Sequence, residues 1–109
     1  MKTHRFRLVT IIAEDTLEER LVKSLISCGV TGYTLWNVRG KGSYQDRTSP
    51  WEGENIQIES IMDDATADRV ADSLSREFID HHGFVLFLTD ADVLRPGKFR
   101  GPGPEKGLS

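Results

Sequence analysis

The sequence predicts one α+β domain in which a four-stranded antiparallel sheet carries two helices on one of its faces. The chain has 109 residues, a length that corresponds to a single domain with one hydrophobic core. Along it, the hydrophobic periodicity changes from a strand pattern to a helix pattern and back, and this order of patterns occurs twice. Two such units with right-handed crossovers interleave into one sheet with both helices on the same side. This arrangement is the ferredoxin-like βαββαβ sandwich.

The first unit comprises a strand, a helix and a second strand. Residues 5–13 (RFRLVTIIA) alternate and then become wholly apolar, which indicates a strand that is buried on both faces at its far end. Thr16 and Glu19 form a capping-box signature for the helix, and Gly29 is expected to end it. The second predicted strand comprises residues 33–38. The helix is expected to bury the face formed by Leu17, Leu21, Val22, Leu25 and Ile26.

The second unit repeats this order. Residues 55–62 alternate between apolar and polar side chains, and either Asp63 or Asp64 is expected to cap the helix that follows. Gly83 precedes an almost unbroken apolar strand, residues 84–89. The helix between these strands is expected to bury Ala67, Val70, Ala71, Leu74 and Phe78.

One face of the predicted sheet has no cover within the chain. Two helices hide only one side, yet residues 84–88 are apolar at every position. A symmetric oligomer that packs sheet against sheet is the simplest cover. The domain is predicted to comprise residues 1–95, because residues 96–109 are rich in Gly, Pro and charge and are expected to form a flexible tail.

Composition and charge exclude several classes of protein. The hydrophobic fraction of 38% and the charged fraction of 28% are typical of a globular chain. No apolar run approaches the roughly 20 residues of a membrane span, so we expect no membrane insertion. The net charge is −3, and residues 48–94 carry eleven acids against two arginines, so nucleic-acid binding is not expected. Cys28 is the only cysteine and is expected to be a small core residue.

The longest predicted loop, residues 40–54, carries the strongest chemical signal. A hairpin loop usually takes about 2–5 residues, so a loop of this length is commonly functional. Its first residues, Gly40-Lys41-Gly42-Ser43, combine a free backbone with an ammonium group and a hydroxyl, and Arg47 adds a planar guanidinium that can hold two phosphate oxygens. The pattern is not a Walker A motif, because no helix follows it. It favours a small anion as ligand.

Two motifs in this part of the chain resemble those of the PII signal-transduction family. Gly29-Val30-Thr31-Gly32-Tyr33-Thr34 is similar to the G-x-x-G-x-T motif that ends the family's first crossover. Val38-Arg39-Gly40-Lys41-Gly42 is similar to the V-[KR]-G-x-G motif that opens the family's T-loop. The resemblance extends from about Phe6 to Arg95. Gly40-Lys41-Gly42-Ser43 and the Gly-Pro-Glu of the tail look most like the PII-like branch found with bicarbonate transporters and carboxysomes.

Family membership implies a homotrimer that binds adenine nucleotides in clefts between subunits. By this resemblance Thr34 lies beside the adenine, and the first residues of the T-loop (40–54) meet the ribose and phosphates. Arg47 matches a phosphate-binding arginine, Gly83 the last glycine of the family's B-loop, and Arg95 an arginine that arrives from the neighbouring subunit. The implied nucleotide-binding residues are Thr34, Gly40, Lys41, Gly42, Ser43, Arg47, Gly83 and Arg95.

The chain departs from the nitrogen-regulatory members of the family near the phosphates. Its B-loop, residues 79–84 (IDHHGF), lacks the lysines that embrace the β- and γ-phosphates in those members. AMP and ADP are therefore expected to bind at least as well as ATP, with cyclic AMP as a further candidate. Bicarbonate is expected in the vacant phosphate region beside Lys41 and Arg47. Tyr44 stands where those members have a glutamine that helps to hold magnesium and 2-oxoglutarate, which argues against nitrogen sensing.

The expected function is that of a cytoplasmic regulator without enzymatic activity. The expected partner is a membrane transporter of bicarbonate or another part of a carbon-concentrating mechanism, contacted through the T-loop at the inner membrane face. No prosthetic group and no metal site are expected, because His4, His81 and His82 are interpreted as solvated loop residues. Two alternatives stay open: a metal-binding trimer of the divalent-cation-tolerance type, and a nitrogen-regulatory PII protein.

Overall fold

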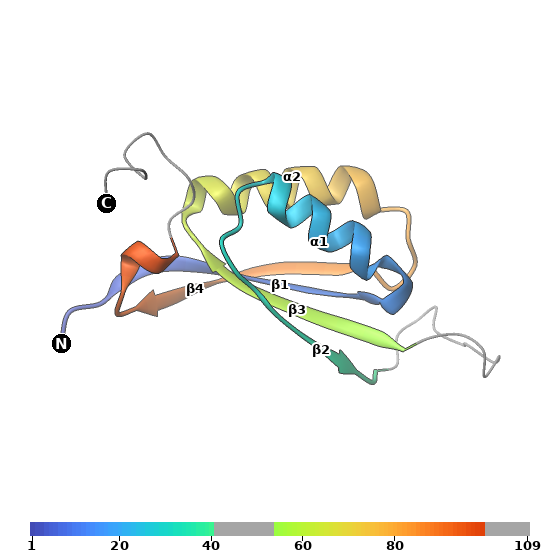
Figure 1. Ribbon diagram of the computed structural model, residues 1–109, viewed down its shortest axis with the longest axis horizontal. Coiled ribbons are helices and arrows are strands. Elements are labelled where there is room, and N and C mark those ends of the chain that lie inside the picture. Colours follow the sequence, from blue (N-terminus) through green and yellow to red (C-terminus); the bar gives the residue numbers. More distant parts are fainter. Residues whose placement is uncertain (41–53, 100–109) are drawn as a thin grey trace.

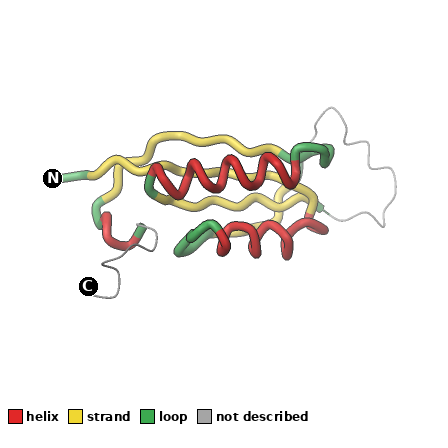
Figure 2. The backbone as a smooth tube through the Cα atoms, turned by 90° about the horizontal axis from the view of Figure 1, so that it is seen from above, coloured by secondary structure: helices red, strands yellow, loops and turns green. Residues whose placement is uncertain are grey.

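The computed structural model describes residues 1–40 and 54–99, and it confirms the predicted fold class. Its strands form one antiparallel sheet in the order β2-β3-β1-β4. Both helices lie on the same side of this sheet (Figure 1), and they run side by side across it (Figure 2). The elements are β1 (His4–Glu14), the 3-10 turn η1 (Asp15–Leu17), α1 (Glu18–Ser27), β2 (Thr34–Val38), β3 (Asn55–Met62), α2 (Asp64–Phe78), β4 (Val85–Val93) and the 3-10 turn η2 (Pro96–Lys98).

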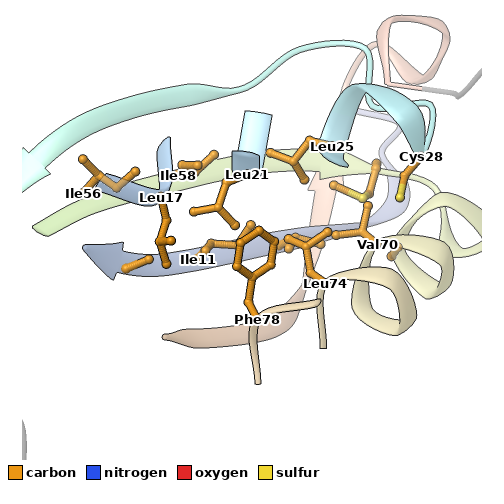
Figure 3. Packing of buried hydrophobic residues seen from close by; sticks show 14 residues of the cluster. Ile11, Leu17, Leu21, Leu25, Cys28, Ile56, Ile58, Val70, Leu74 and Phe78 are labelled. Carbon is orange, nitrogen blue, oxygen red and sulfur yellow. The ribbon is translucent and has the colours of Figure 1, made fainter. Parts of the chain in front are cut away.

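The hydrophobic core lies between the helices and the side of the sheet that faces them (Figure 3). Cys28 is buried there, as predicted. Ile26 is not, and the prediction that it belongs to the buried face of α1 is wrong. It is 62% exposed because it lies about 100° around the helix from Leu25, which is fully buried. The core consists of Val9, Ile11, Ala13, Leu17, Leu21, Leu25, Cys28, Ile56, Ile58, Met62, Ala67, Val70, Leu74 and Phe78.

The opposite side of the sheet, which we call the open face, is covered by neither α1 nor α2 (Figure 1). Because side chains alternate along a strand, the register places Thr34, Glu59, Thr10 and Phe87 in one row across all four strands. The neighbouring row is Trp36, Gln57, Ile12 and Val85. Three large apolar side chains of these rows are exposed: Trp36 by 38%, Val85 by 45% and Phe87 by 46%. The described residues therefore leave part of this apolar face exposed, as expected from the sequence.

The start of α1 differs from the prediction. The chain leaves β1 through η1, so α1 begins only at Glu18, and the residue before it is Leu17, which has no side-chain cap. The capping box predicted at Thr16 and Glu19 is therefore wrong, because Thr16 lies inside η1 and not at the N-cap of α1. The predicted end is confirmed: Gly29 adopts a φ of 95°, a left-handed conformation that glycine reaches without steric cost.

The helix α2 begins as the sequence predicts. Asp63 is its N-cap, and the Asp63 carboxylate accepts a hydrogen bond from the Thr66 N–H at 2.9 Å. This bond satisfies one of the N–H groups that the first turn of a helix leaves without a backbone partner. Of the two candidate caps, Asp63 is therefore the one that acts.

The strand β4 is longer than the sequence predicts. It continues past the predicted range, residues 84–89, through a stretch that contains Asp90 and Asp92. Arg5 Nε donates to Asp92 Oδ1 at 2.7 Å, and both Arg5 and Arg7 donate to the Asp90 carboxylate. The hydrogen bond to Asp92, with the charges of Asp92 and Asp90, raises the pKa of the Arg5 guanidinium above its usual value. Opposite charges paired across β1 and β4 thus support a strand end that lacks an apolar pattern.

The chain after β4 folds back against one end of the open face. The Phe99 ring meets the Phe6 ring edge-on, with centroids 6.1 Å apart, and Thr31 Oγ1 donates to the Lys98 carbonyl oxygen at 3.3 Å. The first residues of the predicted tail, 96–99, are therefore packed against the domain. The rest of that predicted tail lies outside the described residues.

Candidate functional site

The predicted site residues divide into a described and an undescribed group. Thr34, Gly40, Gly83 and Arg95 lie within the described parts of the chain. The remaining four, Lys41, Gly42, Ser43 and Arg47, lie outside them.

Gly40 and Gly83 lie at the same end of the sheet. Val38 pairs with Asn55 at the start of β3, and Val85 pairs with Ile12 near the end of β1. Gly40 follows Val38 by two residues and Gly83 precedes Val85 by two, so the T-loop start and the B-loop meet the sheet at one end (Figure 1). Gly83 has a φ of 82°, so glycine is needed there for the backbone. At both glycines a Cβ atom would meet nothing within 4 Å.

Thr34 lies on the open face, next to a carboxylate that the sequence interpretation did not single out. Its register partner is Glu59 on β3, and Gln57 Nε2 donates to Glu59 Oε2 at 3.3 Å. The alternation of β3 contained the signal, because it places Gln57 and Glu59 on the face opposite Ile56 and Ile58. Thr34 and Glu59 together put a hydroxyl and a carboxylate on a face that is otherwise largely apolar.

Arg95 lies at the other end of the sheet. It follows Val93, which ends β4 and pairs with His4 at the start of β1. The nine residues of β4 therefore separate Arg95 from Gly83. A strand of that length spans roughly 26 Å. Arg95 of one copy of the chain is therefore too far from Gly40 and Gly83 to act beside them.

The B-loop contains no lysine or arginine. Its residues from Ile79 to Gly83 include Asp80 and two histidines, and the His81 ring lies 5.8 Å from the Phe78 ring. Within residues 1–40 and 54–99, no three His, Cys, Asp or Glu side chains are grouped so that they could hold a metal ion. In the same ranges, no helix is long and apolar enough to cross a membrane.

Comparison with known proteins identifies the family. The family model for nitrogen regulatory protein P-II matches residues 6–98. Nitrogen regulatory protein GlnK2 of Haloferax mediterranei is 29% identical over 104 residues, which cover 84% of this chain and 84% of that protein. The family match covers nearly the whole domain. The fold and the glycines at one end of the sheet agree with it.

Solved structures give the same result. A PII-like signalling protein of Thermus thermophilus is 36% identical, with a TM-score of 0.76 over 91% of this chain and 99% of that chain. CPII of Thiomonas intermedia K12, in a structure bound to ADP and bicarbonate, is 28% identical, with a TM-score of 0.79 over 91% of this chain and 98% of that one. Another CPII structure is bound to ADP, AMP and acetate.

These findings define the chain as a ferredoxin-like regulatory domain with two helices on one face of its sheet. The chain belongs to the PII family, and it is a PII-like regulatory protein.

Proposed function

We propose that this protein binds AMP or ADP in clefts between copies of the chain and signals the bound state through the T-loop, residues 40–54. The observation that carries the proposal is the separation of the site residues. Gly40 and Gly83 lie at one end of the sheet, and Arg95 follows the last strand at the other. A site that uses all three needs Arg95 from a second copy.

The open face supplies the surface for that assembly. Trp36, Val85 and Phe87 are each exposed by more than a third of their surface, and contact between copies would remove this apolar surface from water. In a closed ring of identical subunits, every copy buries the same surface. A homotrimer is the assembly that family membership implies.

The proposed ligand is an adenine nucleotide with few phosphates. Thr34 is assigned to the adenine, and Gly40, Lys41, Gly42 and Ser43 to the ribose and phosphates. Lys41, Arg47 and Arg95 are the proposed cations. Because the B-loop contains no lysine or arginine, a γ-phosphate there would lose hydration without gaining a permanently charged donor. AMP and ADP should therefore bind at least as well as ATP, and the ADP and AMP in the CPII structures support this choice.

Bicarbonate is the proposed second ligand, beside Lys41 and Arg47, and the CPII structure with ADP and bicarbonate supports it. Through the T-loop, its binding would couple carbon supply to nucleotide state. The proposed partner is a transporter of bicarbonate or another inorganic-carbon system, contacted at the cytoplasmic face of the membrane. A pull-down with the ADP-loaded and the AMP-loaded protein would test this partner. Capture of such a transporter by only one of the two forms would support it.

Calorimetric titration tests the nucleotide proposal. AMP, ADP and ATP are titrated separately into the full chain, with and without bicarbonate. We expect ADP and AMP to bind at least as tightly as ATP, and bicarbonate to change the affinity. Arg47→Ala should weaken ADP binding by about 1.5–3 kcal/mol if its guanidinium makes a charge-assisted bond to phosphate. Binding of ATP more than tenfold tighter than ADP without added metal would contradict the proposal.

A second candidate function is nitrogen regulation, which the similarity to GlnK2 of Haloferax mediterranei favours. That function would require the effector 2-oxoglutarate to bind together with ATP and magnesium. Titration of 2-oxoglutarate into the ATP- and magnesium-saturated protein separates the two candidates. Saturable binding there would favour nitrogen regulation, and its absence together with a bicarbonate response would favour the carbon-linked function.

A further inference from the structure

The ladder between β1 and β3 ends in an unusual pair. The last regular pair is Glu14 with Asn55, and the next pair in the same register is Asp15 with Glu54. The Asp15 N–H donates to the Glu54 carbonyl oxygen at 2.8 Å. In a regular antiparallel pair of this kind, the Asp15 carbonyl oxygen would accept the return bond from the Glu54 N–H.

The return bond is made by the Asp15 side chain instead. The Asp15 carbonyl oxygen instead accepts the Glu18 N–H in η1. The Glu54 N–H donates to Asp15 Oδ2 at 3.2 Å. The carboxylate thus replaces the main-chain acceptor at the point where the backbone turns away from the sheet. Aspartate and asparagine are the residues whose short side chains present an acceptor to nearby backbone in this way.

This pair lies where both sides of the T-loop meet the sheet. Glu54 is the last residue of that loop, and the next residue, Asn55, pairs with Glu14 on one side and with Val38 on the other. Gly40 follows Val38 by two residues. A single strand pair, Asn55 with Val38, therefore connects Glu54 to the segment that contains Gly40.

We propose that Asp15 is a positioning residue that fixes where the T-loop rejoins the sheet and, through Asn55 and Val38, where Gly40 is held. The role depends on the hydrogen-bond acceptor of Asp15 and not on its charge. The consequence for ligand binding rests on the proposed function, because Gly40 belongs to the proposed nucleotide site. Asp15 itself is no part of that site.

A charge effect is the main competing explanation for Asp15. An acidic residue near the start of a helix is stabilised by the helix dipole, and that effect requires the negative charge. Asp15→Asn removes the charge and keeps an acceptor at the same distance from the backbone, whereas Asp15→Ala removes both. Asp68→Ala, at an exposed aspartate of α2, is the matched control for the loss of one surface carboxylate.

The first measurement is hydrogen exchange at the Glu54 amide in the full chain without ligand. We expect Asp15→Ala to exchange there about tenfold faster than the natural protein, because the amide loses its acceptor. In Asp15→Asn and Asp68→Ala, the exchange rate of the Glu54 amide should stay within about twofold of the rate in the natural protein. Equal exchange in Asp15→Ala and the natural protein, or exchange in Asp15→Asn as fast as in Asp15→Ala, would overturn the proposal. If Asp15→Ala fails to fold, Asp15→Gln replaces it, because its acceptor lies one carbon too far from the amide.

The second measurement is calorimetric titration with ADP. We expect Asp15→Ala to bind ADP about three- to tenfold more weakly, and Asp15→Asn to bind as the natural protein does. An Asp15→Ala variant with fast Glu54 exchange and unchanged ADP affinity would overturn the link to the site. If the natural protein does not bind ADP, the proposed function is wrong, and the exchange measurement still decides whether Asp15 positions the loop.

Discussion

The two faces of the sheet are built from the same strands, yet they differ in what covers them. Towards the helices, Ile11 and Ile58 are each 1% exposed. On the open face, Val85 and Phe87 of β4 are 45% and 46% exposed. Both faces of β4 are nevertheless apolar over residues 85–88, since Leu86 and Leu88 pack against the core. An apolar pattern on both faces of a strand therefore predicts a cover for both, and the described residues bury only the face towards the helices.

A charge placed on the open face should disrupt the assembly of copies, and this is the largest of the expected effects. Phe87→Asp would place a carboxylate in a contact that excludes water, so we expect complete loss of assembly with the monomer fold retained. Ile26→Asp, at an equally apolar exposed position on α1, should leave assembly unchanged. Size-exclusion chromatography with light scattering gives the mass, and far-UV circular dichroism gives the fold. A Phe87→Asp variant with the mass of the natural assembly would contradict the role of this face.

The helix-covered face should govern the stability of each chain. Phe78 is fully buried, its ring stacks on that of Phe84 at 5.6 Å, and the Arg20 guanidinium lies 4.8 Å from the ring centre. Phe78→Ala should therefore lower the free energy of unfolding by about 3–5 kcal/mol. Denaturant unfolding at a single protein concentration measures this, because association adds a concentration-dependent term. The exposed control Ile26→Ala should change it by less than about 0.5 kcal/mol. A loss below about 1 kcal/mol for Phe78→Ala would disagree with the core described above.

The smallest of these effects is expected where residues 96–99 cover one end of the open face. The Phe99 ring contacts the Phe6 ring, and Arg95 lies just before this turn. Phe99→Ala should cost about 1–2 kcal/mol of stability, because the ring is only partly buried. It should also weaken ADP binding, because the Phe99–Phe6 contact anchors the turn that directly follows Arg95. Phe99→Leu, which keeps an apolar contact, should restore both the stability and the ADP affinity. Unchanged ADP affinity in Phe99→Ala would show that this contact does not position Arg95.

Most of the fold could be predicted because its signals are local. The range of β3, the N-cap at Asp63 and the left-handed glycine at position 29 each follow from a few neighbouring residues. The extension of β4 depends instead on a partner far away in the sequence: Asp92 binds Arg5, 87 residues apart. The same holds for Asp15, whose carboxylate accepts the Glu54 N–H across 39 residues at the start of η1, the turn that keeps Thr16 from the N-cap of α1.

Part of the candidate site could also be predicted, because its signals are local. The alternation of the strands places Thr34 on the open face, and the turn between α2 and β4 requires glycine at position 83. The separation of Arg95 from these residues follows from the sheet register and not from any local pattern. Glu59 was missed because a carboxylate in an alternating strand normally indicates only a solvated face. Its position beside Thr34 emerges only when β2 and β3 are paired.

In the proposed function, the nucleotide site exists only between copies that meet through the open face. The most direct test is calorimetric titration of ADP into Phe87→Asp, at a concentration where sedimentation shows it to be monomeric. The natural assembly and the Ile26→Asp variant serve as references. We expect a folded monomer with no measurable ADP binding, while both references bind. A folded Phe87→Asp monomer that binds ADP as tightly as the natural protein would contradict it.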